Sequence, residues 1–274
     1  MKDPFFTILN NFFDHIYVIS LKRSVARHRL LRENLKGLQY SLFWGADGKK
    51  IDVEKLVEDK LYHPGISQLL YKRDGRRINS MTTSKIGCAL SKNMVYKDIL
   101  EKNFKKVLIL EDDVLFDKEK HEILQCSLGE LPSNWDLLFF GYWSYTNPIT
   151  LKEKIKMSFL IKLSRFLMKY DADDIRKRYP RKFSEHLDKS GRHYGTHAYA
   201  VSNMGAKKLL NYSDPVTQFG DNILGELCNY EWLKAFNLKI PVAYQNRYLE
   251  STITSRTQMM DLPPSVIKRN KITF

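Results

Sequence analysis

The sequence predicts an α/β fold, with an open sheet flanked by helices, for two reasons. Short apolar stretches rich in β-branched and aromatic residues recur along the chain, and between them apolar residues repeat with helical spacing. Strands and helices that alternate in this way build sheets covered by helices. The 274 residues, 43% of them hydrophobic, suffice for a substantial core, and no internal repeat or low-complexity linker divides them. We therefore expect residues 1–274 to form a single domain.

The first predicted elements are a strand, a helix and a second strand. Residues 15–21 (HIYVISL) are rich in β-branched and aromatic side chains and predict a strand. The basic residues 22–37 that follow favour a helix, which Gly37 ends. Residues 39–48 (QYSLFWGADG) predict another strand, which ends in a turn.

The middle of the chain predicts a helix followed by two buried strands. Residues 82–103 predict a helix with Thr83 or Ser84 as its N-cap, and its apolar residues lie on two sides, as in a helix packed between two layers. Residues 105–116 (KKVLILEDDVLF) predict one buried strand, and residues 135–143 (WDLLFFGYW) predict the next. Both stretches are too continuously apolar for a strand with one face in solvent.

Residues 147–192 predict a basic helical insertion, because lysine and arginine crowd this part of the chain. Its apolar residues at helical spacing are Ile155, Phe159, Leu163, Phe166, Leu167 and Tyr170. A basic amphipathic helix of this kind can lie on an anionic membrane, cover an active site as a lid, or pack on the core. The sequence leaves these three possibilities open.

The last third of the chain predicts a strand, two helices and a final strand. Residues 193–212 predict a strand followed by a helix, with Ser202 or Asn203 as the N-cap. Residues 221–237 predict a second helix, and residues 238–245 (LKIPVAYQ) predict the final strand.

The chain is strongly basic, with 45 Lys and Arg against 31 Asp and Glu and a formal net charge of +14. This excess favours an anionic partner, such as a nucleic acid, the phosphates of a nucleotide or an acidic membrane surface. A basic surface that only aids solubility is the alternative. We expect no nucleic-acid partner, because the sequence contains no recognisable nucleic-acid-binding motif.

Neither a membrane span nor a secretion signal is expected. No window approaches the roughly 18 uncharged apolar residues that a bilayer-spanning helix needs. The apolar N-terminus is interrupted by Asn10, Asn11 and Asp14 and lacks a small-residue cleavage site. Three cysteines without metal-like spacing argue against a disulfide framework or a zinc site. These features favour the reducing cytoplasm.

Three adjacent carboxylates, Glu111, Asp112 and Asp113, interrupt the apolar run of residues 107–116. Buried like charges a few ångströms apart repel strongly unless positive charge compensates them. A divalent cation is the natural compensation, and carboxylate oxygens suit Mg²⁺ or Mn²⁺. If the strand persists, its alternation sends Glu111 and Asp113 to the same side. A solvated turn or the N-terminus of a helix is the alternative.

Candidate nucleotide contacts follow the first two predicted strands, since the chain has neither a P-loop nor a GxGxxG motif. The first strand ends at Ser20 and Leu21, with Arg23 and Arg27 immediately after. Arginines can bind phosphate, and Asp47 in the turn GADG could accept a hydrogen bond from a base or a ribose. The alternative for each arginine is a solvated helix face.

Four blocks of sequence resemble a known enzyme family. In chain order they are IYVISLKRSVARHR, SKIGCALSKNMVYKDIL, VLILEDDVLF and GTHAYAVSNMGAKKLL. They are similar to glycosyltransferase family 25, the group of lipopolysaccharide and lipooligosaccharide galactosyltransferases, over residues 14–225. The resemblance implies a GT-A type open mixed sheet flanked by helices. It also implies a UDP-sugar donor, usually UDP-galactose, and inverting transfer to a hydroxyl of a lipid-linked oligosaccharide or another glycan, in the cytoplasm or at the cytoplasmic face of the inner membrane.

The resemblance also implies roles for single residues of the acidic motif and of the block GTHAY. Asp113 would bind Mn²⁺ or Mg²⁺ at the donor diphosphate, with Glu111 and Asp112 near the ribose and the metal, so that Glu111 is a second candidate ligand. His197 is a candidate contact to the donor sugar or phosphate. A structural role for this histidine is the alternative.

Inverting transfer is a direct displacement, so a carboxylate must take the proton of the acceptor hydroxyl. Asp221, in QFGDNILGEL, is the candidate catalytic base because the family has a downstream aspartate that opens a late helix. Glu226 is the second choice. An N-cap role for Asp221 is the alternative, and the two roles can coexist.

The sequence departs from the family at two positions of the helical block. The family often has an acidic residue before IGC and a histidine after the serine, where this chain has Lys85 and Lys92. A different donor or acceptor is one inference. A non-catalytic glycan-binding or nucleotide-sugar-binding protein is the other.

Overall fold

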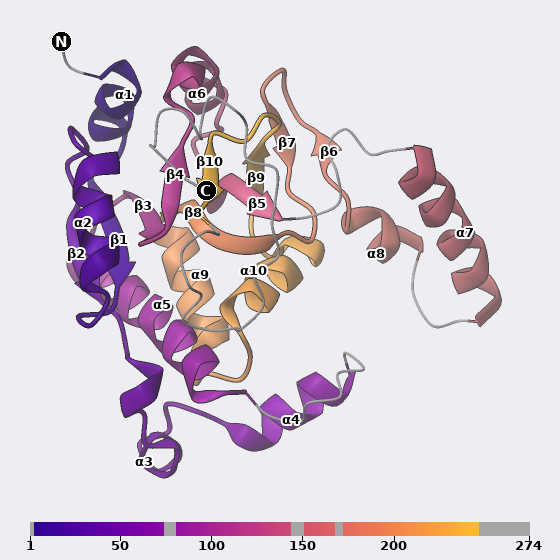
Figure 1. Cartoon of the computed structure of the whole chain (residues 1–274). Coiled ribbons are helices and arrows are strands. Elements are labelled where there is room, and N and C mark those ends of the chain that lie inside the picture. Colours follow the sequence, from indigo (N-terminus) through magenta and orange to yellow (C-terminus); the bar gives the residue numbers. More distant parts are fainter. Residues whose placement is uncertain (1–2, 74–80, 144–150, 168–171, 247–274) are drawn as a thin grey trace.

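The computed structural model describes residues 3–73, 81–143, 151–167 and 172–246 (Figure 1). The strands are β1 (His15–Ser20), β2 (Ser41–Trp44), β3 (Lys106–Glu111), β4 (Val114–Phe116), β5 (Leu137–Trp143), β6 (Arg181–Lys182), β7 (Leu187–Lys189), β8 (Tyr194–Ser202), β9 (Ala235–Leu238) and β10 (Ala243–Gln245). The helices are α1 (Pro4–Phe12), α2 (Val25–Asn34), α3 (Val53–Glu58), α4 (Pro64–Arg73), α5 (Thr83–Glu101), α6 (His121–Gly129), α7 (Leu151–Leu167), α8 (Ala172–Lys177), α9 (Asn203–Ser213) and α10 (Gly220–Asn229). Two 3₁₀ turns are η1 (Gly48–Lys50) and η2 (Lys118–Lys120).

Eight strands of the described chain form one mixed sheet in the order β2-β1-β3-β8-β5-β9-β7-β6. β1 pairs in parallel with β2 and β3, and β8 lies antiparallel between β3 and β5. β9 is parallel to β5, whereas β7 is antiparallel to β9. The predicted α/β fold is confirmed, and the mixed sheet flanked by helices is consistent with the GT-A type.

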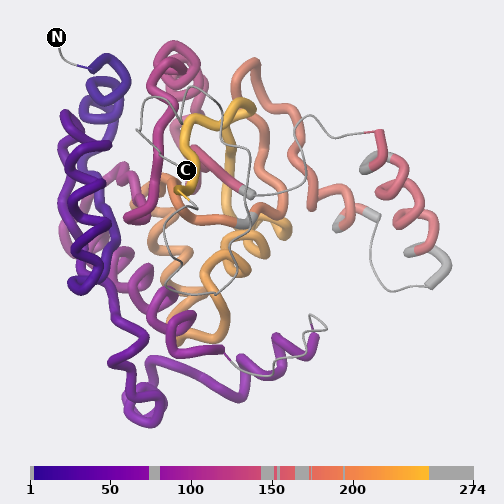
Figure 2. The backbone as a smooth tube through the Cα atoms, viewed as in Figure 1, coloured from indigo at the N-terminus to yellow at the C-terminus, as the bar shows by residue number. Residues whose placement is uncertain are grey.

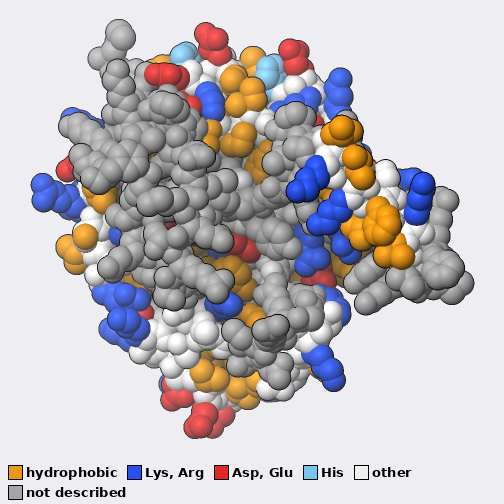
Figure 3. Space-filling view, turned by 45° about the vertical axis from the view of Figure 1, so that its right-hand side comes forward, with side chains coloured by type: hydrophobic (Ala, Val, Ile, Leu, Met, Phe, Trp, Pro, Cys, Tyr) orange, Lys and Arg blue, Asp and Glu red, His pale blue; other side chains and the backbone are white. Residues whose placement is uncertain are grey.

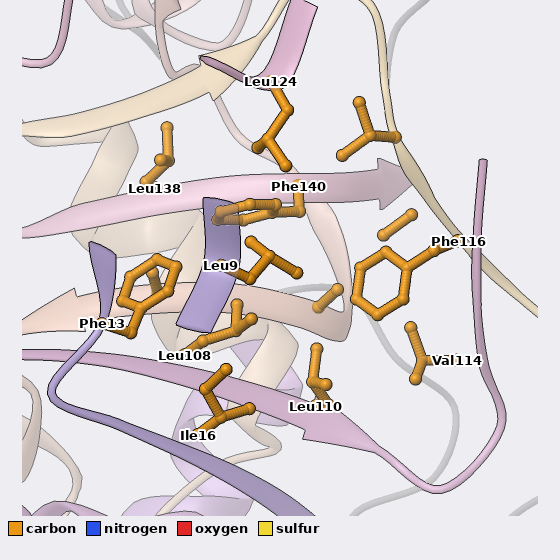
Figure 4. Packing of buried hydrophobic residues seen from close by; sticks show 14 of the residues in the cluster. Leu9, Phe13, Ile16, Leu108, Leu110, Val114, Phe116, Leu124, Leu138 and Phe140 are labelled. Carbon is orange, nitrogen blue, oxygen red and sulfur yellow. The ribbon is translucent and has the colours of Figure 1, made fainter. Parts of the chain in front are cut away.

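The two faces of the sheet build two separate hydrophobic cores, because successive side chains of a strand point to opposite faces. On one face, Leu108 and Leu110 pack with residues of α1, α2 and α6 and of the β4–β10 pair. Figure 4 shows this packing around Leu9, Phe116 and Phe140. On the other face, side chains of the sheet pack against α5, α9 and α10. The sheet is therefore the middle of three layers (Figure 1).

α5 lies between two apolar clusters, as its two apolar sides predict. Val95 and Ile99 belong to the core under the sheet, whereas Ile86 and Ala89 pack with residues of α4 and of the segment before α10. Its N-cap is neither Thr83 nor Ser84. The N-cap is Thr82, whose hydroxyl accepts a hydrogen bond from the backbone N–H of Lys85, and the helix begins at Thr83.

The single strand predicted over residues 105–116 is wrong, because the chain turns at the acidic motif. β3 ends at Glu111, and after Asp112 and Asp113 the chain enters β4, which pairs with β10 in a separate two-stranded sheet. Strand alternation therefore does not relate Glu111 to Asp113. The turn places Asp112 and Asp113 beyond the end of β3.

The helix predicted over residues 221–237 is too long, and the single final strand is wrong. α10 ends at Asn229, and β9 and β10 follow it as two short strands in different sheets. The basic segment 147–192 also holds more than a helix. It contains α7, α8 and the hairpin of β6 and β7, and β7 joins the main sheet. Tyr170 of the predicted apolar stripe lies outside the described residues.

α9 packs closely on the sheet through a glycine near its start. The predicted N-cap Ser202 is confirmed, since its hydroxyl accepts a hydrogen bond from the N–H of Gly205. A Cβ atom on Gly205 would lie 2.0 Å from the carbonyl oxygen of Asp136, which a backbone contact cannot tolerate. No helix in the described part of the chain combines the length and apolar character needed to cross a bilayer.

Gly205→Ala is expected to lower the free energy of unfolding by about 1–3 kcal/mol, because the added methyl group must push α9 off the sheet. Gly129→Ala is the matched control, since a Cβ at Gly129 meets no atom within 4 Å. Urea denaturation followed by circular dichroism measures both variants. Equal midpoints for the two would contradict the close approach of α9.

Candidate active site

The candidate site lies beyond the ends of the parallel strands β1 and β3. Ser20 is the last residue of β1 and Glu111 the last residue of β3, and the register of the two strands brings them to the same edge. β8 runs antiparallel beside β3, so Thr196 near its beginning reaches this edge as well. The carboxyl ends of strands are where open α/β sheets bind ligands.

Asp112 is held by a buried network from β1 and α2. The hydroxyl of Ser20 donates to Asp112 Oδ2 at 2.5 Å, and His28 Nε2 lies 2.9 Å from the same hydroxyl. Arg27 Nη1 donates to Asp112 Oδ1 at 2.5 Å, and the Arg27 side chain is only 12% exposed. Both oxygens of Asp112 therefore have partners. The arginine predicted to bind phosphate also neutralises this carboxylate.

One carboxylate oxygen of Asp113 has no hydrogen-bond partner among the described residues. Its Oδ2 accepts a hydrogen bond from Gln245 Nε2 at 3.0 Å and lies 3.6 Å from Arg27 Nη1. Its Oδ1 is buried and accepts no hydrogen bond from the described residues. Burial and the neighbouring charge of Glu111 raise the pKa of Asp113 to about 7, and Arg27 offsets this only in part.

Glu111 and Asp221 share one hydroxyl. Thr196 Oγ1 lies 2.8 Å from Glu111 Oε1 and 2.9 Å from Asp221 Oδ1, while the backbone N–H of Gly195 donates to Asp221 Oδ2 at 2.9 Å. Burial raises the pKa of Glu111 despite the opposing charge of Lys92. The structure thus brings the candidate catalytic carboxylate next to the acidic motif.

Lys92 is the buried cation of this cluster. Its side chain is 4% exposed, its ammonium group donates to Thr196 Oγ1, and it lies 3.4 Å from Asp221 Oδ1 and 3.7 Å from Glu111 Oε1. Burial alone would lower the pKa of Lys92, but the neighbouring negative groups outweigh it and raise the pKa above its usual value. Lys92 therefore remains charged between two carboxylates.

The remaining candidate donor contacts lie around the ends of β1 and β2. Arg23 Nε donates to Asp47 Oδ2 at 2.8 Å, with the arginine side chain 38% exposed. Burial would raise the pKa of Asp47, but hydrogen bonds from Arg23 and the N–H of Lys49 outweigh it, and the pKa is lowered. The carbonyl of Leu21 accepts a hydrogen bond from the N–H of Ser24. Arg23 and Asp47 therefore pair with each other, and Leu21 contacts Ser24.

Two other candidate residues lie in different surroundings. His197 is buried, and its Nε2 lies 3.3 Å from the carbonyl oxygen of Ala243 in β10. Glu226 is buried in α10, where it accepts from Gln218 Nε2 at 2.8 Å and pairs with Arg73 Nη2 of α4 at 2.7 Å. Glu226 thus joins α4 to α10, and His197 lies against β10.

Sequence reasoning missed Thr196, Gln245 and the place of Lys92 in the cluster. Thr196 stands next to His197 in the block GTHAY, so the block pointed to this segment but not to the threonine. Gln245 reaches Asp113 from far along the chain through the pairing of β10 with β4. For Lys92 the available signal was its departure from the family in the helical block.

The carboxylate oxygens at this edge are of the kind that hard divalent cations prefer. Asp113 offers a buried oxygen without a partner among the described residues, and the charge of Glu111 acts on Asp113. Oxygen ligands of this kind suit Mg²⁺ or Mn²⁺, which bind through one or two carboxylates and leave positions for phosphate oxygens. Arg27 adds a positive charge that favours an anionic ligand.

Comparison with known proteins identifies the family. Residues 13–224 match the family described as Glycosyltransferase family 25 (LPS biosynthesis protein). A "Glycosyltransferase 25 family member" of Drosophila pseudoobscura pseudoobscura is 29% identical over 240 residues, which are 84% of this chain and 33% of that protein. "Procollagen galactosyltransferase 2" of Mus musculus is 28% identical over 244 residues, 87% of this chain and 33% of that protein.

The chain spans about a third of the length of these curated relatives. The family match itself covers well over half of the chain and includes the ends of β1 and β3, Asp221 and the whole of α5. The resemblance of the four sequence blocks is thereby confirmed, and the chain belongs to glycosyltransferase family 25.

Proposed function

We propose that this chain is an inverting, metal-dependent hexosyltransferase that moves galactose from UDP-galactose to a hydroxyl of a saccharide acceptor. The main support for this proposal is the acidic cluster of Glu111, Asp112 and Asp113 at the carboxyl ends of β1 and β3. One buried oxygen of this cluster, Asp113 Oδ1, lacks a partner among the described residues. Family membership supports a nucleotide-sugar donor and a glycan acceptor. Relatives named procollagen galactosyltransferases support galactose as the sugar.

Asp113 and Glu111 are the residues that would hold Mn²⁺ or Mg²⁺. Asp113 Oδ1 is ready to accept a cation without breaking a contact to any described residue. Glu111 would have to exchange its contact with Lys92 for the cation. When bound, the metal would neutralise negative charge on the leaving diphosphate.

Arg27 and the residues at the ends of the first two strands would bind the donor. Arg27 stands between Asp112 and Asp113 and adds positive charge where the diphosphate would lie. Ser20 fixes the orientation of Asp112, so that this carboxylate is held for a ribose hydroxyl. Arg23 and Asp47 form a polar pair beside them that could receive the base.

Asp221 is the residue that would take the proton of the acceptor hydroxyl. The N–H of Gly195, the hydroxyl of Thr196 and the ammonium group of Lys92 hold its carboxylate in one orientation. A fixed base contributes to catalysis because the reacting atoms need not be brought into line. As the acceptor oxygen bonds to the anomeric carbon, its proton passes to Asp221 and the diphosphate leaves from the opposite side.

A lipopolysaccharide or lipooligosaccharide is the acceptor that we propose, at the cytoplasmic face of the inner membrane. The description of the family as a lipopolysaccharide biosynthesis family supports this choice. The names of two relatives give procollagen, a different acceptor. The transferred sugar and the acceptor therefore need separate tests.

A second candidate function is non-catalytic binding of a glycan or a nucleotide sugar. The observation that favours it is Lys92, a fixed positive charge between Glu111 and Asp221. This charge lies against Asp221, the candidate base, and competes with a cation for Glu111. A protein that keeps the donor contacts but has no carboxylate able to take the acceptor proton would bind the nucleotide sugar without transferring the sugar.

Release of UDP tests the proposed function. The protein is incubated with UDP-galactose, UDP-glucose or UDP-N-acetylglucosamine, with a lipooligosaccharide acceptor, in Mn²⁺ or in EDTA. We expect UDP release from UDP-galactose in Mn²⁺ and none in EDTA. Full turnover in EDTA would contradict the metal role, and a preference for another donor would contradict galactose.

A binding measurement separates the two candidate functions. Calorimetric binding of UDP-galactose without UDP release would favour the non-catalytic function. In that case Lys92→His, which restores the residue that the family often has here, is expected to give measurable release. Lys97→His is the matched control, because Lys97 lies on the same helix and pairs with Asp214 at the surface.

A further inference from the structure

Helix α7 presents a continuous apolar stripe to solvent. Leu151, Ile155, Phe159 and Leu163 are 74%, 63%, 63% and 37% exposed. They recur every four residues, so they form one stripe roughly 120° wide along the helix. A surface helix of a soluble domain normally turns such a stripe toward the core. Here it faces outward over three turns of helix.

α7 stands apart from the body of the protein. Figures 1 and 2 show it at the edge of the molecule, beyond α8 and away from the eight-stranded sheet. It packs against α8, and Met157, Leu160 and Ile161 on its other side are half-buried. The orientation of α7 is therefore set by a second apolar side. The exposed stripe is therefore available to contact a partner.

Lysines share the exposed side of the helix with the apolar stripe. Lys152, Lys156 and Lys162 are exposed, and at about 100° per residue they lie within or beside the stripe. The right-hand part of Figure 3 shows apolar side chains next to Lys and Arg side chains. Lysine can bury its carbon chain against an apolar phase and keep its ammonium group at the polar boundary.

We propose that α7 docks on a bilayer surface that contains anionic phospholipid. A bilayer offers an apolar layer under a layer of negative headgroups, which matches a stripe of apolar residues among lysines. A second copy of the chain would place these lysines against one another. A nucleic acid would attract the lysines but leave the apolar stripe in water. This docking requires neither the proposed donor nor the proposed reaction.

Co-sedimentation of the full chain with vesicles tests the docking. We expect the protein to pellet with phosphatidylcholine vesicles that contain phosphatidylglycerol and to stay in solution with pure phosphatidylcholine or in high salt. Lys152→Gln/Lys156→Gln/Lys162→Gln should weaken binding about 100-fold, at about fivefold per lysine. Ile155→Ser/Phe159→Ser should weaken it at least about tenfold, because the apolar contact is lost.

Matched variants separate this surface from the general charge and apolar character of the protein. Lys36→Gln/Lys207→Gln/Lys234→Gln removes the same charge from exposed lysines elsewhere and should leave binding within about threefold. Leu69→Ser/Met204→Ser removes two other apolar residues, 68% and 55% exposed, and should also leave it unchanged. Because all substituted side chains are exposed, thermal unfolding should be the same for all variants.

Three outcomes would overturn the docking. The first is wild-type protein that stays in solution with the anionic vesicles, and the second is equal weakening by the α7 lysine variant and its matched control. The third is a dimer in sedimentation equilibrium that Ile155→Ser/Phe159→Ser disrupts, which would assign the stripe to a second copy. A shift of Trp emission to shorter wavelength in Phe159→Trp on vesicles would support insertion of the stripe.

Discussion

Asp113→Asn is expected to lower the rate of sugar transfer about 1000-fold while the protein stays folded. The amide can keep its oxygen toward Gln245, and its NH₂ group then occupies the place of the oxygen that lacks a partner among the described residues. An NH₂ group cannot ligate a cation. A loss of about 4 kcal/mol of transition-state stabilisation corresponds to about 1000-fold in rate, and a metal contributes several kcal/mol.

The measurement is kcat/KM for UDP-galactose at several Mn²⁺ concentrations, together with the thermal unfolding midpoint without metal. The midpoint should not fall, because Asn removes one of three adjacent carboxylates that repel one another. Asp98→Asn is the matched control, since Asp98 on α5 pairs with Tyr17 and Lys102 and should leave transfer unchanged. Transfer by Asp113→Asn within threefold of wild type would remove Asp113 from the site.

The strands that end at this site could be predicted because their signals are local. The residues of β1 and β3 combine β-branched side chains with continuous apolar character. β1 begins and ends close to its predicted bounds, and β3 begins close to its predicted start. The acidic motif was recognised as an interruption of a buried apolar run, and β3 ends at its first residue, Glu111. This is enough to locate the site on the sheet.

The turn inside the apolar run could not be predicted, because its cause lies far along the chain. Val114 and Phe116 are as apolar as the residues of β3, so the pattern continues through the acidic motif. They leave the main sheet because they pair with β10 and pack under α1. This pairing also delivers Gln245 to Asp113. A contact over 132 positions of the sequence has no local signal.

The role of Lys92 in the cluster could not be predicted from the sequence. From the sequence it is a departure from the family, with no indication of which groups it meets. The packing of α5 between two apolar clusters turns Lys92 inward, to the point where Glu111 and Asp221 come together from two different elements. A helix interior that contains a lysine among buried residues therefore predicts a buried acid, but not which one.

Lys92→Met is expected to destabilise the protein by about 3–5 kcal/mol, the usual cost of removing one partner from a buried ion pair. Methionine fills a similar volume, so little of this loss comes from a cavity. What remains is Glu111 and Asp221 near one hydroxyl, without the ammonium group that compensates both. Urea denaturation at neutral pH measures the loss.

Two comparisons separate the buried ion pair from a general effect of removing a lysine. Lys97→Met on the same helix breaks a pair with Asp214 whose lysine is 43% exposed, and it should cost at most about 1 kcal/mol. In an Asp221→Asn background, Lys92→Met should cost at least about 1 kcal/mol less than in the wild type, because fewer charges are then left without compensation. If the cost is the same in both backgrounds, Lys92 stabilises the fold by packing alone, and Asp221 is held in position by Gly195 and Thr196 without it.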